Sequence, residues 1–111
     1  MIISKSDMLV VTTDSVAGRE IGEVLGLVRG STVRAKHLGT DIVASLRNLV
    51  GGEVREYASL LAGSREQALD RMVDEAFQLG ADAVVAVRMQ TSMIQAGSSE
   101  VLVYGTAVRL T

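Results

Sequence analysis

The sequence contains no cysteine, no proline and no tryptophan. Without cysteine there is no disulfide, no thiolate metal site and no cysteine nucleophile. Without proline a rigid linker is not expected, and 111 residues match the size of one domain. We therefore expect a single domain spanning residues 1–111.

Aromatic residues are also scarce, at 3% of the chain, whereas hydrophobic residues as a whole make up 48%. The core must therefore be built from aliphatic side chains, which bury less area per residue than aromatic ones. This composition fits a protomer that also buries an apolar face against copies of itself. A homo-oligomer is the expected state.

Positive charge is neither in excess nor clustered, with 11 Lys and Arg against 13 Asp and Glu and a net charge of −2. No basic–aromatic run offers a stacking platform for nucleic acid. No apolar run approaches the roughly 20 residues that a membrane helix needs. The first residues, MIISKSDMLVVTTDS, carry charges inside their apolar stretch, unlike a signal peptide. We expect neither nucleic acid nor a membrane as partner, and a cytoplasmic location.

β-Branched runs predict strands in the first third of the chain, at Met8–Thr13 and Glu23–His37, with a polar loop between them. Gly26 and Gly30 lie inside the second strand, where glycine predicts a bulge or a close backbone approach. One face of this strand is expected to hold Leu25, Leu27, Val33 and Ala35, and the other Val24, Val28 and Thr32.

The last third of the chain predicts an antiparallel hairpin. A buried strand from Ala83 to about Ile94 is followed by the short glycine loop QAGSS and then by a second β-branched run, EVLVYGTAVRL. The second strand is expected to place Leu102, Tyr104, Thr106 and Val108 on one face.

Two helices are expected between these pairs of strands. The first begins at Thr40, a good N-cap, and ends before Gly51. The second runs from about Glu53 to Leu79 because its apolar phase survives the pair Gly63-Ser64. Strands, helices and then strands predict an α+β fold, an antiparallel sheet with helices packed on one face.

Arg65 distinguishes two interpretations of the long helix. If the helix is continuous, Arg65 falls on the apolar phase between Leu61 and Ala68, where a guanidinium needs a partner such as Asp82, Glu53 or a group of another subunit. If the helix breaks at Gly63, Arg65 is simply exposed.

Candidate metal ligands are few. His37 is the single histidine, and one imidazole does not make a zinc site unless oligomer symmetry gathers several copies. Met89 and Met93 share one strand face, and soft thioethers can bind copper(I). Methionines at this spacing are more often core filler.

Glu53, Glu56 and Tyr57 follow the glycine pair Gly51-Gly52. Carboxylates beside a phenol could serve acid–base chemistry, but acidic residues also favour a helix N-terminus electrostatically. We prefer the structural interpretation, in which the two glutamates stabilise the helix N-terminus. Neither a catalytic residue nor a cofactor is assigned, and the protein is not expected to be an enzyme.

Three stretches, LVGGEVREY, ALDRMVDEAFQLGADAVVAVR and YGTAV, resemble the YbjQ-like family, to which heavy-metal binding is ascribed. The resemblance extends over nearly the whole chain. It implies a small α+β protomer, dodecin-like in topology, that assembles into a ring-shaped homopentamer.

The resemblance also implies positions for a binding site or subunit interface: Gly52, Glu53, Tyr57, Arg65 and Asp82. Asp82 stands where asparagine is the more usual residue. The expected function is binding of a heavy metal or another small ligand at a site shared between subunits. The alternative is a structural assembly module that binds no ligand.

Overall fold

The computed structural model describes residues 5–35, 53–95 and 98–111. Its elements are the 3-10 helix η1 (Lys5–Asp7), strands β1 (Leu9–Val10) and β2 (Ile21–Ala35), helix α2 (Glu53–Gln78), and strands β3 (Ala83–Gln95) and β4 (Ser98–Leu110). The expected helix from Thr40 to Gly51 lies outside the described residues.

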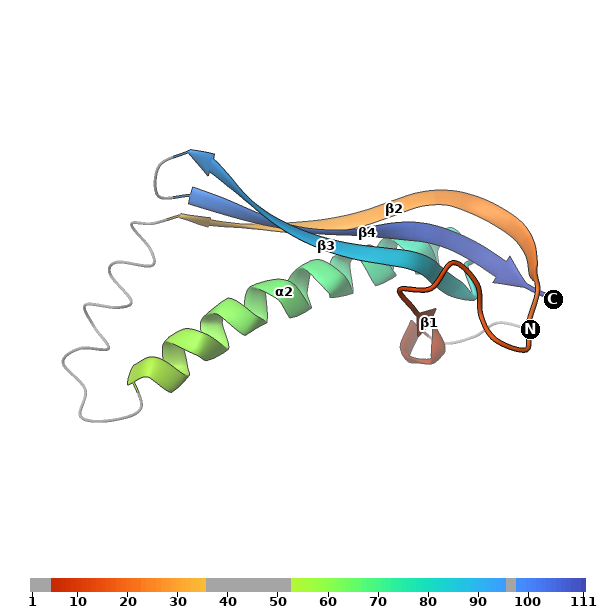
Figure 1. Ribbon diagram of the computed structural model, residues 1–111, viewed down its shortest axis with the longest axis horizontal. Coiled ribbons are helices and arrows are strands. Elements are labelled where there is room, and N and C mark those ends of the chain that lie inside the picture. The colour runs from red at the N-terminus through yellow and green to blue at the C-terminus, as the bar shows by residue number, and fades with distance from the viewer. Residues whose placement is uncertain (1–4, 36–52, 96–97) are drawn as a thin grey trace.

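The sheet is mixed, with strand order β1-β3-β4-β2 (Figure 1). β4 pairs antiparallel with both β2 and β3, so the predicted hairpin is confirmed. β1 pairs parallel with β3, through Leu9 with Ala83 and Val10 with Val84. The expectation of a purely antiparallel sheet is therefore wrong. The α+β class, with a helix on one face, is confirmed.

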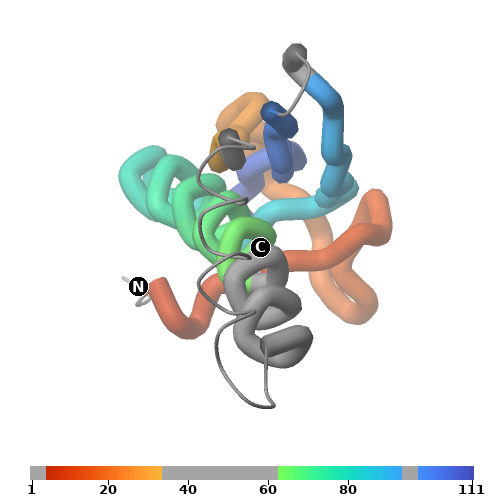
Figure 2. Tube along the Cα trace, turned by 90° about the vertical axis from the view of Figure 1, so that its left-hand side faces the viewer, coloured from red at the N-terminus to blue at the C-terminus, as the bar shows by residue number. Residues whose placement is uncertain are grey.

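Helix α2 is continuous from Glu53 to Gln78, as the apolar phase predicts, and Ser64 lies within it. It packs chiefly on β2, less on β4 and least on β3. Figure 2, viewed along the long axis, shows α2 beside β2 and β4, with β3 on the far side of β4. Toward its first residue the helix diverges from the strands (Figure 1).

The core between α2 and the sheet is aliphatic. From residue 63 onward, where side chains of α2 are described, the fully buried residues are Ser64, Ala68, Met72 and Ala76, a ridge at spacing four. The sheet contributes Val28, Val84, Val87, Val101, Val103 and Ala107 to this core. A smaller cluster of Ala83, Val85 and Val108 lies apart from it.

Both predicted roles for glycine occur in β2. Gly26 has φ +128° and lies at a register shift, so it is part of a bulge. Gly30 is the close approach, because a Cβ there would collide with the Ala68 carbonyl oxygen. The bulge changes the alternation of β2: Leu25 packs against the core, whereas Leu27 is 64% exposed. The prediction that Leu25 and Leu27 share a face is therefore wrong.

On β4 the predicted alternation holds. Leu102, Tyr104 and Thr106 are half-buried, and their neighbours Val101, Val103 and Gly105 are buried. Since Val103 and Ala107 belong to the helix-side core, the alternate residues face away from α2. No described helix is long and apolar enough to span a membrane.

Candidate functional site

A groove lies between the 3-10 helix η1 and helix α2. It has a volume of 570 Å³ and is lined by Lys5, Ser6, Glu66, Leu69, Asp70 and Val73. Leu69 and Val73 are partly buried against the core and supply its apolar surface. Acidic side chains recur on the helix at Glu66, Asp70 and Asp74, spaced by four residues and so on one face.

Lys5 joins η1 to this acidic face. Its Nζ lies 2.8 Å from Oδ1 of Asp70 and 2.5 Å from Oδ1 of Asp74. A hydrogen bond to Asp70, the largest cause, and a second one to Asp74 raise the pKa of the Lys5 ammonium above its usual 10.5. The Lys5 ammonium is therefore shared between Asp70, which lines the groove, and the neighbouring Asp74.

The charge and shape of the groove favour a cationic group with an apolar body, and such a ligand would compete with Lys5. Carboxylate oxygens prefer hard cations, whereas soft heavy metals prefer thiolates, thioethers and imidazoles. Among residues 5–35, 53–95 and 98–111 there is no group of three or more His, Cys, Asp or Glu able to hold a metal ion.

The turn after α2 is a second place where polar groups converge. Gly80 has φ +80°, and the N–H groups of Gly80 and Ala81 donate to the carbonyls of Phe77 and Ala76, at 3.0 and 3.1 Å. This is a Schellman ending, in which a left-handed glycine satisfies the last helical carbonyls. Gly80 thus closes the helix, and the predicted end near Leu79 is confirmed.

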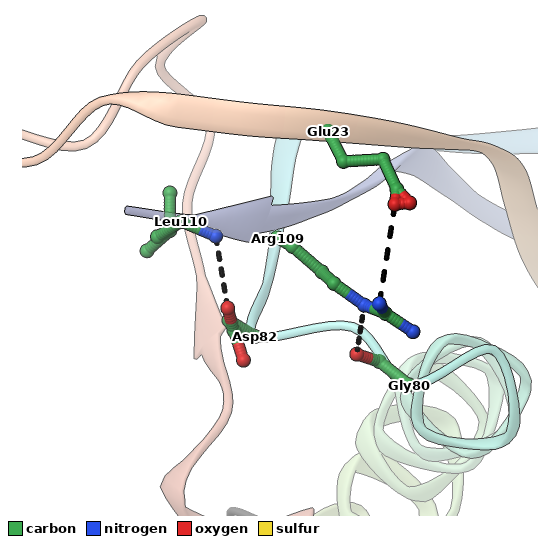
Figure 3. A network of polar contacts seen from close by, with 5 residues as sticks. All are labelled: Glu23, Gly80, Asp82, Arg109 and Leu110. Atoms are coloured by element: carbon green, nitrogen blue, oxygen red, sulfur yellow. Dashed lines mark hydrogen bonds and ion pairs between the residues drawn. The ribbon is translucent and has the colours of Figure 1, made fainter. Parts of the chain in front are cut away.

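The end of β4 holds this turn in place (Figure 3). Oδ2 of Asp82 accepts a 2.8 Å hydrogen bond from the Leu110 backbone N–H. Nε of Arg109 donates to the Gly80 carbonyl at 3.2 Å, and its Nη1 lies 3.9 Å from Oε2 of Glu23. A cation at this position also complements the negative end of the helix dipole. Asp82 thus has a structural role within the protomer.

The structure does not bring the predicted site residues together. Gly52 lies outside the described residues. Glu53 and Tyr57 lie in the first turns of α2, and Asp82 follows its last turn. Arg65 is roughly 18 Å beyond Glu53 along the axis, at about 1.5 Å per residue, and a similar distance before the end of the helix. Within one protomer these residues do not form one site, and a shared site stays a prediction.

Arg65 is exposed although the helix is continuous. The expectation that continuity would bury it is wrong, because the buried ridge is one residue out of phase and contains Ser64 and Ala68. Gly30 explains which face of the helix is buried. Because Gly30 has no side chain, α2 approaches β2 closely there, and its small residues face the strand. The Asp82 carboxylate, one predicted partner of Arg65, accepts its hydrogen bond from the Leu110 backbone N–H.

The thioethers of Met89 and Met93 do not converge on one preformed site. They lie on one strand, 48% and 79% exposed, with Cα atoms roughly 13 Å apart at about 3.3 Å per residue. His37 lies outside the described residues. The sequence interpretation missed the Lys5–Asp70–Asp74 cluster, whose available signal was the spacing of four between Glu66, Asp70 and Asp74.

The sequence was compared with known protein families. A family model for YbjQ, described as "Putative heavy-metal-binding", matches residues 8–111. The chain belongs to this family. The resemblance carried by LVGGEVREY, ALDRMVDEAFQLGADAVVAVR and YGTAV is therefore confirmed.

Relatives in the family bear the name UPF0145 protein. One from Methanosarcina acetivorans is 55% identical over 103 residues, covering 93% of this chain and 97% of the relative. One from Archaeoglobus fulgidus is 55% identical over 106 residues, covering 96% and 98%. Another, from Halorubrum lacusprofundi, is 56% identical over 98 residues, covering 88% and 94%.

A solved structure supports the fold. A protein of unknown function of the DUF74 family from Pediococcus pentosaceus superposes with a TM-score of 0.61, over 94% of this chain and 98% of that one. Its sequence identity to this chain is 16%. At this level the similarity establishes the fold.

Proposed function

We propose that this YbjQ-family protein is a homo-oligomer that binds a small ligand or a metal ion at a site shared between subunits. The assembly we propose is the ring of five subunits that the family resemblance implies. Its role is binding, without catalysis. The family's heavy-metal description applies to this chain only as part of this proposal.

The observation that carries the proposal is the exposed sheet. The Cα radius of gyration is 17.3 Å, whereas a compact domain of this length has about 13 Å. Val24, Leu27 and Val33 of β2 are each more than 60% exposed. Exposed apolar side chains on an extended sheet favour burial against another protein surface.

The distribution of the candidate site residues supports a shared site. Glu53, Arg65 and Asp82 are spread along and beyond a helix of 26 residues. A ligand that contacts more than one of them therefore requires a second copy to bring the distant positions together. Arg65 is exposed and hence available to such a neighbour.

Two measurements test the proposal. Native mass spectrometry of the purified protein should give one discrete oligomer, and a spectrum of monomer alone would refute the assembly. Calorimetric titration with a panel of divalent and soft metal ions should then give saturable heat with at least one ion. If no ion gives heat at micromolar protein, the metal form of the proposal fails.

Variants on α2 locate the site. Glu53→Gln should weaken ligand retention while the oligomer keeps its mass. Glu75→Gln is the matched control, because Glu75 is an exposed residue of the same helix. Equal ligand retention in both variants would remove Glu53 from the site.

The second candidate is an assembly module with no ligand. It is favoured by the lack of a metal-ligand group among the described residues. Under this alternative Glu53→Gln lowers oligomer mass or melting temperature, and the oligomer carries no extra mass through purification. A retained small molecule in native mass spectra would exclude it.

A further inference from the structure

The outer edge of β3 is only partly covered. β1 pairs with its first residues, through Leu9 with Ala83 and Val10 with Val84. The next contacts come from the loop after β1, where the N–H groups of Ala86 and Val87 donate to Thr13 and Val11 at 2.8 and 3.0 Å. The Arg88 guanidinium then donates to the Thr12 carbonyl at 2.9 Å. The first part of this edge is thus filled by the chain itself.

Beyond Arg88 the rest of β3, Met89–Gln95, continues with no described strand on that side. Its sequence, MQTSMIQ, contains no charge, no proline and no glycine. The residues from Met89 to Met93 are exposed, Met93 by 79%. A register shift follows between Met93 and Gln95, and the exposed, uncharged stretch before it is of the kind that pairs readily with another strand.

The opposite edge of the sheet, β2, is better protected. It has register shifts near Gly22 and Leu25, and bulges twist an edge away from foreign strands. Arg71 of α2 donates to the Ser31 carbonyl at 2.6 Å, so a helix side chain already engages this strand. Arg29 adds an exposed charge. Because β3 also has register shifts, the helix contact and the exposed charge on β2 are what distinguish β3 as the more open edge.

We propose that Met89–Gln95 of β3 is an intersubunit edge that pairs with a strand of a second copy of this chain. The inference rests on the proposed homo-oligomer and specifies where its subunits join. A second copy is the favoured partner because the open segment carries no charge pattern to select a foreign peptide. The chain's net charge of −2 also opposes self-association only weakly.

The same sheet strengthens the argument for a second copy. The β3–β4 hairpin extends where α2 diverges from the strands (Figure 1), so among the described elements the helix gives little support to this end of the sheet. Pairing along Met89–Gln95 would satisfy the outward backbone groups and bring the exposed Met93 against protein. Methionine adapts well to such interfaces.

Hydrogen exchange on the native oligomer tests the proposal directly. Outward amides of Met89–Gln95 should exchange at least about tenfold more slowly in the oligomer than in the dissociated protein. Equally fast exchange in both states would overturn the inference. A wild-type protein that is monomeric at all concentrations would overturn both the inference and the proposed oligomer.

Lysine variants give the second readout. The double variant Thr91→Lys/Met93→Lys should lower the oligomer mass, because lysine on an edge strand opposes pairing. Gln67→Lys/Gln78→Lys is the matched control, because both residues are exposed on α2 and the variant adds the same two charges. The control should keep the wild-type oligomer mass, and an oligomer that survives the β3 variant would refute pairing at β3. Circular dichroism verifies that each variant is folded.

Discussion

Gly30 of β2 and Ala68 of α2 lie so close that a Cβ atom on residue 30 would collide with the carbonyl oxygen of Ala68. The same Cβ would lie 2.5 Å from the Met72 backbone nitrogen. Both obstacles are backbone atoms, which move only with the whole helix. This contact sets the separation of helix and sheet, and Thr32 reinforces it by donating a 3.1 Å hydrogen bond to the Ser64 carbonyl.

Gly30→Ala should therefore be strongly destabilising. One added methyl must displace α2, and overpacking of a core costs about 1–3 kcal/mol, with the upper end expected against backbone. Urea unfolding followed by circular dichroism measures the change. An unfolding free energy within about 0.5 kcal/mol of wild type, the usual range for a surface substitution, would show that the helix adjusts freely.

Gly63→Ala is the opposite case on the helix side. Gly63 is exposed, and an added Cβ would meet nothing within 4 Å. Because alanine favours a helix interior by about 1 kcal/mol over glycine, this variant should be more stable than wild type. Thermal unfolding should show a higher melting temperature. A lower one would mean that the helix needs its glycine for another contact.

Ala86 has φ +54°, in the left-handed region that alanine disfavours. It lies in the bulge of β3, where Ala86 and Val87 together oppose Gly105. Ala86→Gly should stabilise the protein by about 1 kcal/mol, since the left-handed conformation costs a non-glycine residue about that much. Denaturant unfolding measures the gain.

Gly26→Ala is the control for this prediction. Gly26 has φ +128° and open space around it, so alanine there meets conformational strain without a clash. It should lose stability where Ala86→Gly gains it. If both variants lose stability, packing at the bulge outweighs backbone strain.

Asp82→Ala should destabilise the turn after α2. It removes the acceptor of the Leu110 N–H, and a hydrogen bond to a charged group contributes about 1.5–3 kcal/mol. Asp82→Asn retains an oxygen that can accept the same bond and should recover most of the loss. Equal stability of the two variants would show that the carboxylate acts by charge alone. Chemical unfolding of the three proteins decides this.

The stabilisation that the Lys5 ion pairs contribute should decrease at alkaline pH. The pKa of Lys5 is raised above 10.5 in the folded protein by Asp70 and Asp74, so the stabilisation is fully present below pH 10.5. It is lost as pH rises through the folded pKa. The melting-temperature difference between wild type and Lys5→Met should therefore shrink above pH 10.5. A difference that stays constant would mean that the ammonium contributes nothing.

Salt gives an independent check of the same cluster. The side chains of Asp70 and Asp74 are 64% and 49% exposed, so their attraction to Lys5 is screened. The difference between wild type and Lys5→Met should fall as sodium chloride is raised.

The local elements follow from the sequence because their causes are local. The apolar phase across Gly63-Ser64 predicts the unbroken helix, and Gly80 predicts its end, since a left-handed residue closes a helix whatever its surroundings. The β-branched runs on either side of QAGSS predict the hairpin. The glycines of β2 predict a bulge or a close backbone approach, and the structure has one of each, at Gly26 and Gly30.

The candidate site could be predicted less fully from the sequence than the fold. The Lys5 cluster joins residues 65 and more positions apart, and only the folded chain brings η1 onto α2. Glu53, Arg65 and Asp82 share one family pattern, yet a helix of 26 residues holds them apart within the protomer. Spacing along a chain says nothing about which distant segments meet.

The sequence by itself determined the class of the fold, the long helix, the hairpin and the YbjQ family. Tertiary structure alone decided that β1 joins β3 in parallel, that the bulge at Gly26 turns Leu25 inward and Leu27 outward, and that Arg65 is exposed while Ser64 is buried. The physical reason is that a helix or strand pattern fixes which residues share a face. Which face is buried depends on a distant neighbour, here the bare backbone of Gly30 against Ala68.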